Sequence, residues 1–499
     1  MEALRQRARS RPAILWLTPV LVGVCILAFP DNAIEAMIGG AIALLVFAFV
    51  ASRPGQALIA LVVFLPLQLL GFALLLTLHV PGALLRPAGA ISEVLALAVL
   101  VAGLRQLRDA HHRLDRIDIA LLLYLVAVTL YLLFPHVFAS GAPTAWNTRL
   151  LAWRSDAGYP LLFFGVRHAP IPPRLKGRFL SVVMGLGALI AVLALYQEVA
   201  PASWSSFVLN TAHLATYQLK VSGIQPYLIV QELEYLFFIS PLRVSSIFAS
   251  PFDMSDYLIL VVAIAAVRIR DNTGRSWMNY AVLAASLGAI YFSRVRGDAV
   301  AVVVILILMA LPGARRPREG RMRLVGVLCI GAILIIPSLG GSRYVGAAGG
   351  SSSTSAHITE IEHGLKLIAD RPLGLGLGSE PSDRQYLVSA TSDTSEDAIL
   401  QVSNELGVQA LVPWLAMMAF ILLALRRRAR DGDAFASIMG FALLGILIAG
   451  LTHHVFLVLP DPWTLWAGVG LALTTYRPAR PRSDNALLTE LAPPPAGVP

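Results

Sequence analysis

The sequence has few charged residues and almost no cysteine. Charged side chains make up 14% of its 499 residues, against about 25% in an ordinary soluble domain. This shortage, with a mean hydropathy of +0.71, excludes a typical cytosolic enzyme. Cys25 and Cys329 both lie in apolar runs, where a small hydrophobic side chain fits. The chain is therefore no disulfide scaffold, and it has no Cys-x-x-Cys or His-Glu-x-x-His metal motif.

Long apolar runs are what the sequence has in abundance. Apolar residues make up 57% of the chain, and one membrane span takes about 20 of them. The runs lie near residues 14–29, 33–51, 56–78, 90–104, 118–135, 150–166, 179–199, 251–268, 278–293, 298–313, 324–340, 399–425, 434–459 and 462–476. They predict an all-α, polytopic membrane bundle of about 14 transmembrane helices, with a range of 12–14.

The basic balance of the chain gives the orientation of these spans. The sequence has 39 Lys+Arg against 30 Asp+Glu, a net charge of +9. With the N-terminus inside and the spans alternating, 28 of the 39 lysines and arginines fall on the inner side. This asymmetry follows the positive-inside rule. The positive charge is therefore a topology signal, and we expect no nucleic-acid partner.

The chain reads as one membrane domain over residues 1–476. Its two long loops, about 200–250 and 341–398, fall on the outer side, and residues 229–238 within the first suggest an interfacial helix. Arginines precede the first apolar run without a clear cleavage site after it, which favours an uncleaved helix. Residues 477–499 are polar and proline-rich, so we expect a disordered cytoplasmic tail.

Several arginines stand in short motifs at the predicted outer boundary. They are Arg154, Arg243, Arg294, Arg296 and Arg371. A guanidinium at this depth is costly unless it is paired or lines a wet cavity. One alternative is that each arginine reaches the membrane interface or pairs with an acid such as Asp156, Asp253 or Asp298. The other is that several of the arginines converge on one site. Converging guanidinium groups would bind a diphosphate well, because their planar forks meet phosphate oxygens in pairs.

Two acidic residues stand where the twelfth span begins, in SEDAILQVSNELGVQALVPWL. Glu396 or Asp397 there could accept a proton from a sugar hydroxyl. The alternative is helix capping, because Ser395 followed by acidic residues is typical of a helix start. Further along, His453 and His454 suggest either a proton relay or a hydrogen-bonded interfacial pair. The Asp431-Gly432-Asp433 triplet suggests a solvated turn rather than a metal site.

Four segments together resemble the family of O-antigen ligases and polysaccharide polymerases. They are RVSSIFASPF before a span, SRVRGDAV between two spans, the long outer loop with ADRPLGLGLGS, and SEDAILQVSNELGVQAL. The resemblance covers about residues 150–475. It implies an integral membrane glycosyltransferase of the GT-C type that needs neither metal nor cofactor. The donor would be a glycan linked to polyprenyl diphosphate, such as undecaprenyl diphosphate.

The chain departs from the ligases at the motif that carries their histidine. In ligases this His precedes a Gly at a fixed spacing. If Gly407 is that Gly, Glu396 stands at the position of the ligase His. Asp397 follows where ligases have Asn, Ser or Gln, and Ala410 replaces a Gly, Thr or Tyr. The resemblance therefore implies a polymerase of O-antigen or exopolysaccharide rather than a lipopolysaccharide ligase.

The expected protein works in cell-envelope assembly at the bacterial cytoplasmic membrane, with its site facing the periplasm or the exterior. Its partners would be the lipid-linked oligosaccharide, a glycan acceptor, the bilayer and a chain-length regulator or other assembly proteins. The rival class is a transporter or flippase of lipid-linked glycans. Transporters place ionisable residues at the bilayer midplane. Here the polar residues gather in two outer loops, which favours the enzyme.

Overall fold

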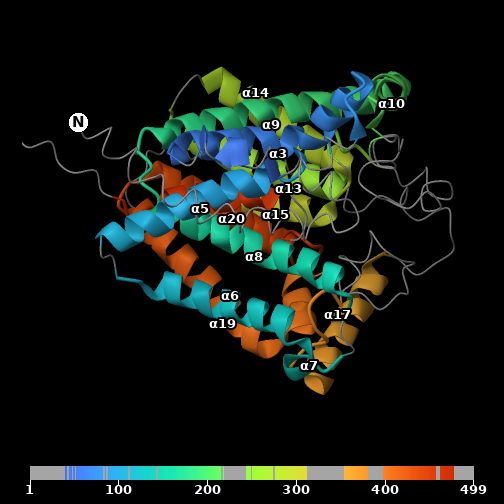
Figure 1. Cartoon of the computed structure of the whole chain (residues 1–499). Coiled ribbons are helices and arrows are strands. Elements are labelled where there is room, and N and C mark those ends of the chain that lie inside the picture. Colours follow the sequence, from blue (N-terminus) through green and yellow to red (C-terminus); the bar gives the residue numbers. More distant parts are fainter. Residues whose placement is uncertain are drawn as a thin grey trace, which may run out of the picture.

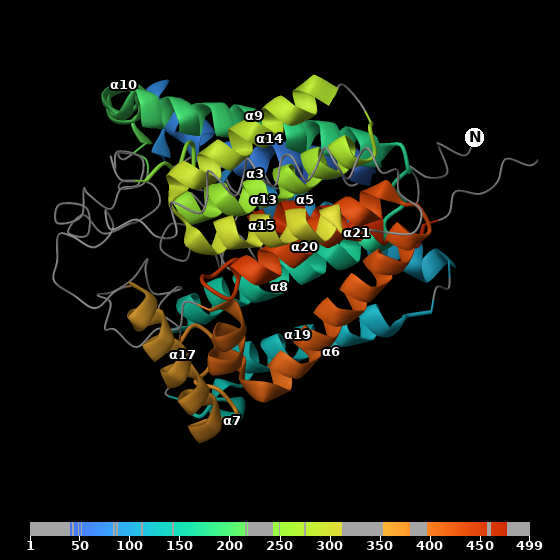
Figure 2. The same ribbon diagram turned by 180° about the vertical axis from the view of Figure 1, so that it is seen from behind.

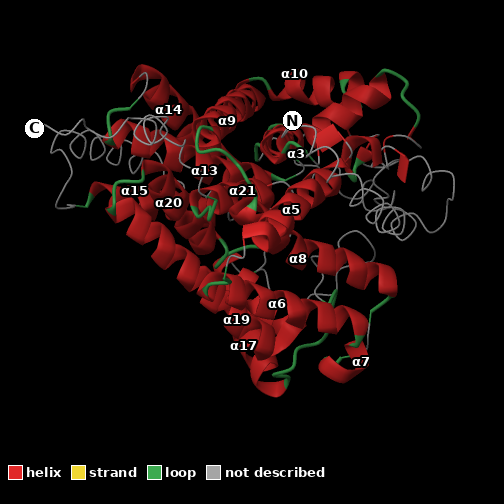
Figure 3. Ribbon diagram, turned by 60° about the vertical axis from the view of Figure 1, so that its left-hand side comes forward, coloured by secondary structure: helices red, strands yellow, loops and turns green. Residues whose placement is uncertain are grey.

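The computed structural model of the protein consists, over its described residues, of helices joined by loops and turns (Figure 3). The described residues are 40–41, 44–47, 49–50, 52–82, 85, 88–110, 113–141, 144–214, 217, 243–248, 250–273, 276–311, 353–379, 397–456 and 461–476. These ranges contain α-helices and one short π-helix and no strand. The all-α class predicted from the apolar runs is therefore confirmed over the described part of the chain.

Eleven of the fourteen predicted runs correspond to a helix. These helices are α3 (Pro54–Thr77), α5 (Ile91–Ala110), α6 (Arg116–Leu133), α8 (Trp146–His168), α9 (Leu175–Val199), α13 (Pro251–Arg270), α14 (Ser276–Ser293), α15 (Arg296–Ala310), α19 (Ala398–Arg430), α20 (Ala434–Ala449) and α21 (Asp461–Ala472). Four of them, α3, α6, α9 and α19, are long and apolar enough to cross a membrane. The total of about 14 spans stays a prediction, because runs 14–29 and 324–340 lie outside the described residues.

Helix α20 is shorter than the run that predicted it. Asp433 begins it, since its side chain accepts a hydrogen bond from the Ala436 amide. The helix ends at Ala449, ten residues before the predicted limit, and Gly450 is its C-cap. Hydropathy extended the run through Val455 and Phe456, which are buried but lie in the turns that follow. The predicted run thus merged a helix with the polar segment that contains His453 and His454.

The centre of the bundle is α13, which is buried on all sides. It packs against α9, α14, α15 and α20 (Figures 1 and 2). A helix that is apolar around its whole circumference can be stable only inside a protein or a membrane. The polar residues of α13 are confined to its two ends, where Asp253 and Asp256 stand in the first two turns and Arg270 in the last.

Helices α6 and α19 lie side by side and, through α8 and α20, join the rest of the bundle (Figures 1 and 2). The short helix α7 (Pro135–Phe138) and α17 (Ser353–Asp370) lie at the same end of the bundle as α10 (Pro201–Ser206) and the π-helix η1 (Phe207–Thr211). We call this the α17 end. It corresponds to the side that the charge pattern assigns to the exterior.

The second long loop contains a helix that hydropathy did not reveal. Helix α17 occupies part of the predicted loop 341–398, and its Ile358, Ile361 and Leu365 are exposed. These residues are spaced as one helical face. The sequence pattern missed this helix because it is amphipathic rather than continuously apolar. Residues 229–238 and the tail 477–499 lie outside the described residues.

Candidate functional site

The segment before α13 carries Arg243 and is held in place by α9. The Gln197 side chain, near the end of α9, accepts hydrogen bonds from the Ser245 and Ser246 amides at 3.1 and 2.9 Å. The Ser246 hydroxyl donates to the Ile190 carbonyl at 2.9 Å. Because Gln197 is itself buried, these bonds fix the backbone just after Arg243.

The turn between α14 and α15 meets this segment. The Val244 amide donates to the Phe292 carbonyl at 3.3 Å, so the backbone at Arg243 lies beside the turn that carries Arg294 and Arg296. All three arginines are partly buried and have interaction partners. Arg294 has a positive φ of 59°, a conformation that non-glycine residues rarely adopt. The structure thus places side by side the backbone segments that carry three of the five predicted arginines.

The other two predicted arginines have separate surroundings. Arg154 on α8 forms an ion pair with Glu93 on α5, and its side chain is 41% exposed. Arg371 follows α17 and is exposed. The contacts of the described residues do not join either one to Arg243. Pairing with an acid, one of the alternatives for these arginines, is therefore the arrangement found for Arg154, although its partner is Glu93.

Asp397 at the mouth of α19 caps that helix. One oxygen of its carboxylate accepts hydrogen bonds from the Ile399 and Leu400 amides at 2.7 and 3.1 Å. Burial raises the pKa of the Asp397 carboxyl above its usual value, while the two backbone bonds act in the opposite direction. The capping alternative is therefore realised by Asp397. Glu396 and Ser395 lie outside the described residues.

The glycines of RPLGLGLGS serve the kink of α19. Gly407 interrupts the helix with a φ of +68°, and Gly374 in the loop has a φ of +76°. At this interruption the loop forms backbone hydrogen bonds with α19. The Leu375 amide donates to the Asn404 carbonyl at 2.6 Å, and the Val408 amide donates to the Pro372 carbonyl at 3.0 Å. A Cβ at Gly407 would overlap the Pro372 carbonyl. These glycines are needed for close backbone packing rather than for a nucleotide.

The segment after α20 lies against the mouth of α19. The Ala398 amide donates to the Gly450 carbonyl at 2.8 Å, and the His454 ring lies 2.8 Å from the Gln401 side-chain oxygen. His453 turns the other way, toward α13, and its Nε2 lies 3.2 Å from an Asp256 carboxylate oxygen. The two histidines therefore have different partners, which neither of the sequence alternatives for the pair distinguished.

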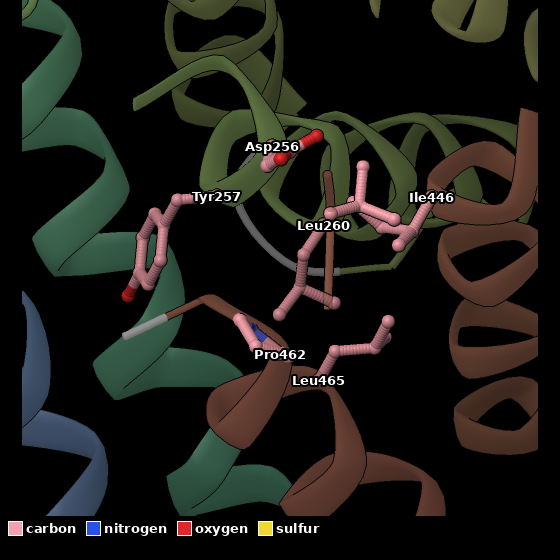
Figure 4. Close-up of a pocket in the computed structure, with 7 residues that line it drawn as sticks. Asp256, Tyr257, Leu260, Ile446, Pro462 and Leu465 are labelled. Atoms are coloured by element: carbon pink, nitrogen blue, oxygen red, sulfur yellow. The ribbon is translucent and has the colours of Figure 1, made fainter. Parts of the chain in front are cut away.

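A small cavity adjoins Asp256. It measures about 10 Å³, and its lining is mostly apolar (Figure 4). The residues around it are Asp256, Tyr257, Leu260, Ile446, Val455, Pro462 and Leu465. A space of this size holds about one water molecule. It is too small for a sugar or a diphosphate.

The comparison with known families agrees with the motifs. The family model described as O-antigen ligase matches residues 281–415. The resemblance to the O-antigen ligase family is confirmed. The matched residues include most of α14, all of α15 and α17 and the first part of α19, and therefore Arg294, Arg296 and Asp397. None of the curated proteins matches the chain.

The match to the O-antigen ligase family, together with the apolar helices, supports a glycosyl-transferring membrane protein. Arg154 and Arg243 precede the matched region, whereas Arg371 and Glu396 fall inside it. The bond between Val244 and Phe292 joins the backbone next to Arg243 to the matched region. The sequence singled out Arg243 because it stands before a predicted span. The structure adds that the backbone there lies beside the turn between α14 and α15.

Proposed function

We propose that the protein is a polysaccharide polymerase or ligase that transfers a polyprenyl-diphosphate-linked glycan to a sugar hydroxyl. The transfer takes place at the outer face of the bacterial cytoplasmic membrane, at the α17 end. The observation that carries this proposal is the hydrogen bond from Val244 to Phe292, which sets the backbone at Arg243 beside the turn that carries Arg294 and Arg296. The family match supports the class of reaction.

The arginines would bind the diphosphate of the donor. A guanidinium donates two parallel hydrogen bonds to phosphate oxygens, and its charge persists at every physiological pH. The acceptor oxygen attacks the anomeric carbon, and the bond from that carbon to the phosphate oxygen breaks. The diphosphate leaves with the bonding electrons, and the arginines stabilise its charge. A single displacement of this kind inverts the anomeric configuration, and no metal enters it.

The proton of the acceptor hydroxyl passes to a carboxylate at the mouth of α19. Asp397 is already engaged by two backbone amides as a cap. Glu396, which precedes it, is therefore the preferred base. Since Glu396, Asp397 and Ala410 all depart from the ligase motif, we assign the chain to polymerisation rather than to ligation onto lipopolysaccharide. A polymerase would work with a chain-length regulator or other assembly proteins.

Lysine substitutions at Arg243 and Arg294 test the phosphate role. Lysine keeps the charge but loses the planar fork. Since a hydrogen bond to a charged group contributes about 1.5–3 kcal/mol, we expect Arg243→Lys and Arg294→Lys each to lower polymer formation roughly 10- to 100-fold. The assay uses purified protein in nanodiscs with a lipid-linked oligosaccharide, and product length is followed on gels.

The matched control is Arg108→Lys. Arg108 lies on α5, is largely exposed and pairs with Asp109, so its substitution should leave polymer formation unchanged. Near-normal yields in both Arg243→Lys and Arg294→Lys would reduce these residues to structural anchors. Transport of the lipid-linked glycan across the bilayer, with no new glycosidic bond, would instead establish the flippase alternative.

A further inference from the structure

Three buried side chains converge where α13 and α15 begin and α20 has ended. His453 Nε2 lies 3.2 Å from an Asp256 oxygen and 3.6 Å from Asp298 Oδ1. Asp256, Asp298 and His453 each have one possible metal-ligand atom within 4.8 Å of those of the other two. Across the described ranges, no lysine or arginine forms an ion pair with Asp256 or Asp298. Two buried carboxylates therefore share one histidine.

The contacts of His453 are compatible with a neutral ring that carries its proton on Nδ1. The Thr452 hydroxyl donates to the Ala449 carbonyl at 2.8 Å, so its oxygen is available as an acceptor. His453 Nδ1 lies 3.2 Å from that oxygen and can donate to it. In the neutral ring this leaves a lone pair on Nε2, facing the two carboxylates. A metal-bound histidine has this arrangement, with its second nitrogen donating to an outer group.

Asp298 supplies an independent indication of a ligand. Its side chain is fully buried, and its Oδ1 has no hydrogen-bond partner. Its other oxygen contacts the Ser255 hydroxyl. A buried carboxylate oxygen without a donor is costly and rare in folded proteins. Oδ1 is the oxygen on the His453 side, so the unsatisfied atom points into the cluster.

Gly297 allows the cluster to form. It stands directly before Asp298 and lies against the Thr452 side chain, where a Cβ would overlap the hydroxyl. The start of α15 can therefore approach the segment that carries His453. The cavity of about 10 Å³ beside Asp256 adds room for one water molecule next to the cluster (Figure 4).

We propose that Asp256, Asp298 and His453 bind one divalent transition-metal ion, such as Zn²⁺. Mixed oxygen and nitrogen ligands suit this class of ion, and three protein ligands leave a fourth position for water. Two carboxylates would balance the charge of the ion, so that the buried site becomes neutral. The ion would tie α13 and α15 to the segment after α20. It takes no part in the transfer proposed above and goes beyond it.

Cobalt titration of the full chain tests the proposal. The purified protein, with any affinity tag removed, is treated with EDTA and titrated with Co²⁺, whose visible absorption reports nitrogen and oxygen ligands. We expect saturation at one ion per chain, displacement by Zn²⁺, and a melting temperature that rises with Zn²⁺ concentration. Failure of the wild-type protein to take up Co²⁺ would overturn the proposal, and this measurement needs no variant.

Variants assign the bound ion to the cluster. Asp298→Asn and His453→Gln each remove one ligand and should weaken Co²⁺ binding at least tenfold. His454→Gln is the matched control, because this neighbour contacts Gln401 instead and should leave the cobalt spectrum unchanged. Equal uptake by all three variants would place the ion elsewhere and refute the site. A wild-type melting temperature that does not respond to Zn²⁺ would refute the site as well.

Discussion

Two clusters of charged side chains lie at opposite ends of the bundle, and they differ in the origin of their positive charge. At the end away from α17, Arg167 closes α8 and contacts both Asp115 and Asp118. His168 Nε2 lies 3.0 Å from the Asp118 carboxylate. The chain itself provides the permanent cation here, as is typical of a buried structural ion pair.

At the α17 end, Asp256 and Asp298 have only His453 as a basic partner within the described residues. A histidine changes its charge near neutral pH, whereas an arginine does not. The acids of the first cluster are therefore neutralised by the chain itself. In the second cluster, Asp298 Oδ1 has no hydrogen-bond donor. Burial of charge alone therefore does not mark a functional site. A buried acid that has no permanently charged basic partner among the described residues is a better candidate for one.

The structural end also shows how a helix start can secure such a pair. Asp115 and Asp118 form a reciprocal capping box at the beginning of α6. Burial alone would raise the pKa of the Asp115 carboxyl, but the Arg167 guanidinium outweighs it, so that the pKa falls below its usual value. Acids that are held by a cap and by an arginine stabilise the fold, and we expect them to have no part in transfer.

The largest expected effect concerns the proposed base, Glu396, which precedes α19 in the sequence. Glu396→Gln removes the proton acceptor but keeps the size of the side chain. We expect transfer to fall roughly 10²–10⁴-fold, because this is the usual contribution of a positioned base. Donor binding and melting temperature should be retained. Transfer at the wild-type rate would contradict the carboxylate mechanism and leave departure of the diphosphate, assisted by the arginines, as the main catalytic factor.

The next effect belongs to the structural end. Arg167→Leu leaves Asp118 buried without its guanidinium, and breaking such a pair costs about 3–5 kcal/mol. The free energy of unfolding, measured by denaturation in mixed micelles, should fall by that amount. Replacing Asp118 by Leu as well should restore much of the loss, because the half-exposed Asp115 stays solvated. A single variant as stable as the wild type would show that the cluster contributes nothing.

The apolar runs of the sequence predicted the long helices better than the segments that connect them. Apolar runs located α3, α9 and α13 within a few residues, because continuous hydropathy is a local property. The amphipathic helix α17 lacks such a run and was expected to be a loop. The end of α20 was misplaced because Val455 and Phe456 are apolar but not helical.

Contacts between distant residues explain what the sequence could not give at the site. His453 and Asp256 are separated by 197 residues, so no local pattern pairs them. Arg243 was selected by its position before a span, but the sequence did not show that the segment after it meets α14, as the hydrogen bond from Val244 to Phe292 does. Pairing with an arginine was one alternative for Asp298, and the structure places this residue against His453 and Ser255.

Acidification should destabilise the α17 end through His454. Burial, with a smaller effect of His453, lowers the pKa of His454 to about 4, against about 6.5 in an unfolded chain. Between these values the unfolded state binds more protons, so stability falls as the pH decreases from 6.5 to 4. The loss is at most about 3 kcal/mol, since one pKa unit corresponds to about 1.4 kcal/mol.

The variant His454→Gln isolates this effect. Glutamine has no proton to gain in this range and can still meet Gln401. Melting temperatures measured from pH 7 to pH 4 should therefore decrease less in the variant than in the wild type. Parallel curves for the two proteins would show that the acid sensitivity arises from other groups.

The smallest effect concerns Asp397, and it separates capping from catalysis at the mouth of α19. Asparagine is as good a cap as aspartate but cannot take up a proton at neutral pH. Asp397→Asn should therefore keep both stability and transfer, whereas Asp397→Ala should lower the free energy of unfolding by about 1 kcal/mol. Polymer formation and thermal denaturation, measured on both variants, provide the test. If Asp397→Asn folds normally yet loses transfer, the base is Asp397 rather than Glu396, because its carboxylate would then be needed for its proton affinity and not for the two amides it caps.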